Sequence, residues 1–191
     1  MKKYFNPTIF LQKVIGDQLY QAMHGPALEA VRREASNNAY WQNQKEQFKK
    51  ESVQITSRTF PKLFNLCQQA VKATCFSENI EFYITSDPYV NAHSMSSDNP
   101  ENQPHFVELQ SALVRAATDQ ELLFVLGHEI GHIINGDSQL KKLFRYLYEK
   151  LDDAPDFIIT RLDLYQLLSE LGADRYGYIW FKTWHFGPRY C

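Results

Sequence analysis

The sequence predicts a single α+β domain over residues 1–191, with a helical part over residues 1–77 and a mixed part over residues 78–191. Three observations support this class. The length and the 44% content of hydrophobic residues suit one core. A small mixed sheet is expected only from about Ile80 to Gln110. Two long stretches with the apolar spacing of helices follow it.

The N-terminal part carries helical patterns over residues 26–76, with a break near Thr56–Pro61. Pro61, with Thr59 before it, indicates a new helix start. An apolar stripe follows, formed by Leu63, Phe64, Cys67, Ala70 and Val71. We expect these helices to cover the back of the domain. Shielding of a cleft, as by a propeptide, is the alternative.

The first long helix is expected from Asp119, which can cap it, to Gly136, a residue suited to the left-handed end of a helix. The second is expected over about Thr160–Phe181. Both show apolar residues at helical spacing. They are Leu122, Leu123 and Leu126 in the first, and Leu162, Tyr165, Leu168 and Ile179 in the second.

The first long helix contains the pattern H-E-x-x-H, with histidines at 128 and 132. Because a helix repeats every ~3.6 residues, His128 and His132 share a face and can bind one metal ion. Glu129 lies one step round the helix and can polarise a metal-bound water. The pattern therefore predicts a catalytic zinc site of the peptidase type. The alternative is a pair of core histidines bonded to carbonyl groups.

A catalytic zinc usually takes three protein ligands, and Glu170 is the best candidate for the third. Asp174 is four residues further on and shares its face, so it can accept the free ring N–H of a ligand histidine. A solvated acidic face is the alternative for this pair. The small residues Gly172 and Ala173 favour a close approach of the two helices.

Taken together, Leu126-Gly127-His128-Glu129-Ile130-Gly131-His132 and Glu170-x-x-Ala173-Asp174-Arg175 resemble the gluzincin family of HtpX, the CAAX prenyl proteases and the mitochondrial Oma peptidase. The resemblance covers roughly residues 80–181. It implies a zincin-like metallopeptidase domain in which His128, His132 and Glu170 bind Zn²⁺. It also implies that Glu129 is the general base and that Asp174 supports a ligand histidine.

The resemblance extends to the region before the metal helix. It implies that Phe106–Leu109 is a strand at the sheet edge that pairs with an extended substrate, and that Asn91 and Ala92 hold the peptide backbone. For Asn91, an ordinary turn role is the alternative. The polar stretch His93–Pro104 is expected to be a loop, either a lid or a mobile segment. The chain departs from the family at Gln166-Leu167, where a Ser-Arg pair is common.

The tetrahedral oxyanion of peptide hydrolysis needs a second stabilising donor beside the metal. The C-terminal segment offers four, which are Tyr176, Tyr178, His185 and Arg189. The sequence does not choose among them, and we take His185 as the first catalytic candidate. The three histidines without metal-like spacing are left out of the site: His24, His93 and His105.

The composition limits partners and location. A net charge of −2 predicts no nucleic-acid surface. No targeting segment and no ~20-residue apolar span is found, and Leu140–Leu151 has the spacing of an amphipathic helix packed on the domain. We expect no membrane-surface contact. Three cysteines without CxxC spacing predict neither a disulfide framework nor a second zinc site, which favours the cytoplasm. The oligomeric state is left open.

These features predict a cytoplasmic zinc metalloendopeptidase that cleaves peptides or unfolded proteins. Two alternatives remain. One is a zinc-containing module that binds peptides without cutting them, against which Glu129 argues, because a structural site has no use for an acid beside a water. The other is an autoinhibited peptidase domain of a longer protein.

Overall fold

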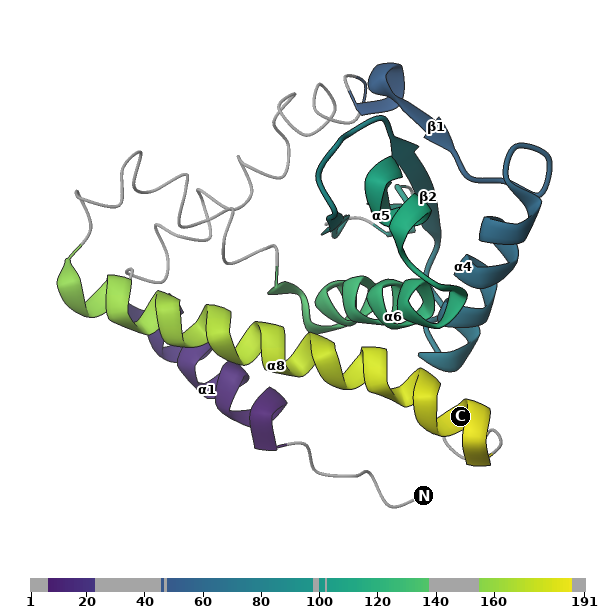
Figure 1. Cartoon of the computed structure of the whole chain (residues 1–191). Coiled ribbons are helices and arrows are strands. Elements are labelled where there is room, and N and C mark those ends of the chain that lie inside the picture. The colour runs from purple at the N-terminus through teal and green to yellow at the C-terminus, as the bar shows by residue number, and fades with distance from the viewer. Residues whose placement is uncertain are drawn as a thin grey trace.

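The computed structural model describes residues 7–22, 46, 48–97, 100–101, 103–137 and 155–186. They form three layers: a mixed sheet, helices packed on one of its faces, and a long helix behind them (Figure 1). Residues of the sheet and of the helix layer share one hydrophobic core, which includes Phe82, Val107, Leu109, Leu126 and Ile130. The predicted α+β class is confirmed.

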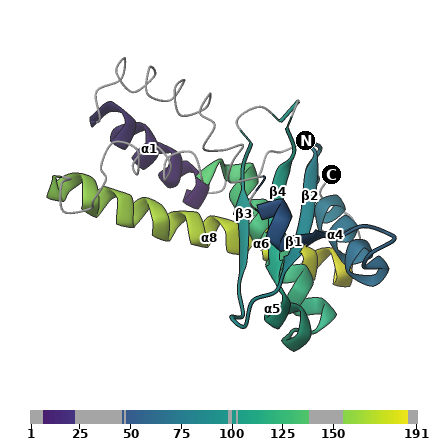
Figure 2. The ribbon, with the colours of Figure 1, turned by 90° about the horizontal axis from the view of Figure 1, so that it is seen from above.

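In the described part of the chain the sheet contains four strands: β1 (Ser52–Gln54), β2 (Ile80–Thr85), β3 (Ala92–Met95) and β4 (His105–Gln110). Their order is β1-β2-β4-β3, with β2 parallel to β4 and the other pairs antiparallel (Figure 2). The prediction that Phe106–Leu109 lies at the edge is therefore wrong. Residues from the expected polar loop form β3, which pairs with β4 and takes the edge position itself.

The region before β2 is only partly helical. Residues 52–54 were expected in a helix, but they form β1 and pair with β2 in the register Ser52–Thr85. The next helix, α4 (Pro61–Ala73), has Pro61 in its first turn as predicted. Its residues Leu63, Cys67 and Ala70 are buried in the core. Thr59 does not cap α4, because the N-cap position belongs to Phe60; the hydroxyl of Thr59 donates to the carbonyl of Gln54 and accepts from the N–H of Thr56.

After β4 come the short helix α5 (Ser111–Ala116) and the 17-residue helix α6 (Asp119–Asn135). The N-cap of α6 is Thr118, not Asp119. Thr118 accepts a hydrogen bond from the backbone N–H of Glu121, whose carboxylate accepts in turn from the N–H of Thr118. Gly136 ends the helix in the left-handed conformation with φ 70°, as predicted.

The second long helix, α8 (Asp156–Phe186), has 31 residues and lies across α6. The N-terminal helix α1 (Pro7–Ala22) runs beside the first half of α8 (Figure 1). The approach of α6 to α8 depends on glycines. A Cβ at Gly127 would lie 2.9 Å from the carbonyl oxygen of Tyr176, and one at Gly131 would lie 3.0 Å from Cα of Ala173. This contact holds the predicted ligand helices against each other.

Several predicted features lie outside the described residues. They are the helical patterns of residues 26–45, His24, the amphipathic helix Leu140–Leu151 and Arg189. Across the part of the chain that is described, no helix combines the length and the hydropathy that a membrane span requires.

The structure corrects the expectation for the cysteines. Cys67 is buried with a free thiol, but Cys75 is disulfide-bonded. Disulfides are rare in the reducing cytoplasm, and the cytoplasmic location stays a prediction.

Candidate metal centre

Three side chains from α6 and α8 converge at the contact of the two helices. Nε2 of His128 lies 3.0 Å from Nε2 of His132, and Oε2 of Glu170 lies 3.4 Å from the first and 3.5 Å from the second. The two histidines are four residues apart on α6, so the helical repeat places both rings on the face turned to α8. One ligand atom from each residue can reach a single ion, since all three atoms lie within 4.8 Å of one another.

Each histidine is held by a carboxylate through its other ring nitrogen. Nδ1 of His128 donates to Oδ1 of Asp174 over 2.9 Å, and Nδ1 of His132 donates to Oδ2 of Asp137 over 2.8 Å. The hydroxyl of Ser169 lies 3.3 Å from Nδ1 of His132. Such bonds fix the tautomer and the orientation of an imidazole, so that Nε2 keeps its lone pair for a metal.

This arrangement fits a bound cation. With both Nδ1 atoms used as donors, two Nε2 lone pairs and the carboxylate oxygen of Glu170 face one another. Three acceptors this close repel each other unless a cation or a proton lies between them. Two imidazoles and one carboxylate are also the donor set of catalytic zinc sites, in which the fourth position is left to water.

The charges around the site act on His132. Burial by itself lowers the pKa of His132, but the hydrogen bond that its ring N–H donates to Asp137 and the negative charges of Asp137, Glu129 and Glu170 outweigh it, and the pKa is raised. The carboxylates around His132 thus favour positive charge on its ring. A metal cation would satisfy the same preference.

Glu129 follows His128 in α6, and its side chain is buried. Its negative charge is one of the causes that raise the pKa of His132. A carboxylate in this position can accept a proton from a water on the ion without being one of the three converging groups.

The structure does not place a second oxyanion donor. The side chain of His185 lies outside what the structure describes, although its backbone belongs to α8. Tyr176 packs over Gly131, and burial followed by the charge of Asp137 raises the pKa of its phenol. Tyr178 is exposed and meets the ring of Phe124 edge to face, with ring centroids 5.5 Å apart.

Asn91 and Ala92 lie at the start of the edge strand β3, which contacts α6. The side chain of Asn91 accepts from the N–H of Ala92 over 2.9 Å, and its amide nitrogen lies 3.3 Å from Nε2 of His93. Asn91 is exposed and Ala92 is buried. Of the described strands, only β4 pairs with β3, so the other edge of β3 is not used by them.

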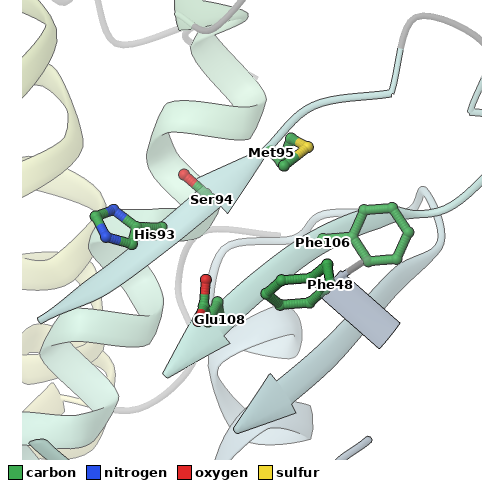
Figure 3. A pocket seen from close by; sticks show the side chains of 6 residues that line it. All are labelled: Phe48, His93, Ser94, Met95, Phe106 and Glu108. Carbon is green, nitrogen blue, oxygen red and sulfur yellow. The ribbon is translucent and has the colours of Figure 1, made fainter. Parts of the chain in front are cut away.

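A small pocket of about 40 Å³ lies over the paired strands β3 and β4 (Figure 3). It is mainly apolar, and none of the three ligand candidates lines it. Its lining residues are Phe48, His93, Ser94, Met95, Phe106 and Glu108. The register pairs His93 with Glu108 and Met95 with Phe106, so the last two strands of the sheet supply most of its wall.

Two residues near the ligands could not be predicted from the sequence. Asp137 was not predicted, although it follows Gly136 directly, because a carboxylate just after a helix usually lies in solvent. Gln12 of α1, which donates to Asp137, had no signal at all, since the two are 125 positions apart. Two of the histidines that were left out of the site are described. His93 lies in β3, and His105 lies in β4, where its ring is hydrogen-bonded to Glu78.

Comparison with known proteins gives one finding. The model of the family described as Peptidase family M48 matches residues 57–180. The matched range runs from just before α4 to near the end of α8, and it includes His128, His132 and Glu170. Searches among curated proteins and solved structures found no match.

Proposed function

Since this chain belongs to peptidase family M48, we propose that it is a zinc-dependent endopeptidase in which Glu129 activates the attacking water. The family indicates a metal-dependent hydrolase that acts on peptide bonds. The main support for zinc and for the role of Glu129 is the convergence of His128, His132 and Glu170. Each imidazole there is hydrogen-bonded through Nδ1 to a carboxylate.

Zinc suits these ligands better than a hard cation does. Two neutral imidazole nitrogens and one carboxylate favour Zn²⁺, whereas Ca²⁺ and Mg²⁺ prefer oxygen ligands. When bound there by His128, His132 and Glu170, zinc would supply a Lewis acid and a water whose pKa is close to 7. The carboxylates of Asp174 and Asp137 keep both imidazoles in the tautomer that can bind it.

The protein's own acid–base step belongs to Glu129. Its carboxylate takes a proton from the attacking water as the water oxygen bonds to the scissile carbonyl carbon. When the C–N bond breaks, the protonated Glu129 gives that proton to the leaving amine. The Glu129 carboxylate is thereby regenerated. Burial of Glu129 suits this exchange, because it limits competition from bulk water. His185 remains our proposal for the second donor to the oxyanion.

We propose that the substrate lies along β3 as an additional antiparallel strand. The edge of β3 that no other described strand occupies, and the contact of β3 with α6, support this placement. Main-chain hydrogen bonds would hold peptides of many sequences, with Asn91 and Ala92 at the start of the strand. The pocket beside Met95 and Phe106 has the lining to take an apolar side chain of such a peptide.

The first test is zinc content. Elemental analysis after exhaustive dialysis should find about one zinc per wild-type chain and little in Glu170→Ala, because a site with two ligands holds zinc weakly. Asp163→Ala is the matched control, since Asp163 is an exposed acid on the same helix and lies away from the ligands. Wild-type protein without zinc, even after resupply, would contradict the proposal.

The second test is cleavage. Zinc-loaded wild type should cut casein at internal bonds, and Glu129→Gln should bind zinc normally but lose almost all activity. Zinc binding without cleavage by the wild type would instead favour the peptide-binding module or the autoinhibited domain. Release of single residues from the chain ends would contradict endopeptidase action.

A further inference from the structure

The N-terminal helix α1 reaches the candidate metal centre through one side chain, Gln12. This residue is 3% exposed, and its Nε2 donates to Oδ1 of Asp137, which is 2% exposed. The other oxygen of Asp137 accepts from Nδ1 of His132 over 2.8 Å. Two consecutive hydrogen bonds therefore connect α1 to a metal-ligand candidate on α6.

The orientation of the Gln12 amide is set by Asp137. A carboxylate can only accept, so the amide must turn its nitrogen to Asp137, and its Oε1 is then buried without a hydrogen-bond partner among the described residues. An unsatisfied buried carbonyl is unfavourable, and apolar packing alone would be served better by a leucine. The polar residue at this position is explained by its bond to Asp137.

A second contact from α8 supports the same carboxylate. The hydroxyl of Tyr165 lies 3.4 Å from Oδ1 of Asp137, and its ring packs against Gly16 of α1, where an added Cβ would lie 3.3 Å away. Gly172 of α8 leaves room for Gln12, since a Cβ there would lie 3.3 Å from Oε1 of Gln12. Residues of α1 and α8 thus enclose Asp137 on the side away from His132.

We propose that Gln12 is a positioning residue of the metal centre, which holds Asp137 so that His132 presents Nε2 to zinc. α1 lies outside the range that matches the family, residues 57–180, so the centre would be completed by a helix from outside that range. The inference rests on the proposed zinc site. It predicts that zinc affinity, and not only stability, depends on α1.

The test compares zinc dissociation constants of purified full-length variants, measured by competition with a chelator. Gln12→Leu keeps the size of the side chain but cannot donate, and zinc should bind at least about 10-fold more weakly, as is usual when a group that orients a ligand is lost. Gln18→Leu is the matched control, because Gln18 is exposed on the same helix, and it should bind zinc as the wild type does.

Two readouts separate positioning from a merely structural role. In NMR of zinc-loaded protein, the proton on Nδ1 of His132 should shift or exchange faster in Gln12→Leu. In an Asp137→Ala background, Gln12→Leu should have no further effect on zinc affinity, because its partner is already gone.

An unchanged dissociation constant in Gln12→Leu would overturn the inference, and so would an equal loss of affinity with and without Asp137. A wild type that binds no zinc would count against the proposed function instead.

Discussion

Asp137 folds back onto the helix that precedes it, so that its Oδ2 lies 2.8 Å from Nδ1 of His132, five residues earlier. The reversal is made by Gly136, whose φ of 70° directs the chain back toward α6. The left-handed C-cap thus ends the helix and also delivers the carboxylate that orients a ligand histidine.

Replacing Gly136 should affect both stability and zinc binding. A Cβ at Gly136 meets nothing within 4 Å, so Gly136→Ala acts only through backbone strain, which costs about 1–2 kcal/mol in the left-handed region. If the strain is relieved by moving the turn, Asp137 moves too and zinc binds more weakly. Gly136→Asn is the control, because asparagine tolerates this conformation. Denaturant unfolding gives the stability and chelator competition gives the zinc affinity. Equal stability and equal zinc affinity of Gly136→Ala and Gly136→Asn would contradict the prediction.

Gly127→Ala should force α6 and α8 apart. The new Cβ would lie 2.9 Å from the backbone oxygen of Tyr176 and 3.1 Å from Cα of Gly177, and neither can move without shifting the helix. We expect a loss of about 1–3 kcal/mol from overpacking, reduced by up to about 1 kcal/mol of helix propensity. Gly16→Ala is a milder comparison, since its Cβ would meet only the ring of Tyr165 at 3.3 Å. Equal unfolding midpoints for the wild type and Gly127→Ala would show that the contact is not tight.

The capping box of α6 should make stability depend on pH. Hydrogen bonds from the backbone and side chain of Thr118 lower the pKa of Glu121 from its ordinary value of 4.5. The stabilisation that ionised Glu121 provides is therefore complete above pH 4.5. It is lost as the pH falls through the lower pKa that Glu121 has in the folded state. In metal-free protein, the difference in unfolding free energy between wild type and Glu121→Gln should shrink over that range. A difference that grows on acidification would reverse the assigned sign.

Loss of the cap itself should be measurable at neutral pH. Thr118→Ala removes the acceptor for the N–H of Glu121 and should cost about 1 kcal/mol. Thr118→Ser keeps a hydroxyl and should retain most of the stability that Thr118→Ala loses. The measurement is chemical denaturation, and a cost for Ser as large as that for Ala would contradict the capping role.

The buried thiol of Cys67 should be inert in the folded protein. Burial raises its pKa to about 12, so hardly any reactive thiolate exists at pH 8. Alkylation with iodoacetamide, followed by peptide mapping, should leave Cys67 unmodified without denaturant and fully modified with it. Rapid labelling of Cys67 in the native state would mean that the core around α4 opens readily.

The sequence determined the parts of this protein that depend on local periodicity. The spacing of His128, His132 and apolar residues gave the metal-bearing helix, and the family match over residues 57–180 confirmed the resemblance drawn from these motifs. Pro61 and Gly136 marked helix ends correctly because proline and glycine fix their own backbone angles.

Tertiary structure decided what depends on partners distant in sequence. A short polar strand such as β3 takes its place from the strand it pairs with, so the edge of the sheet was assigned to the wrong segment. The choice of Thr118 over Asp119 as the N-cap was settled by the angles at which the chain enters α6. The link from Gln12 through Asp137 to His132 exists only because α1 and α8 pack together and bring an amide, a carboxylate and an imidazole within hydrogen-bonding distance.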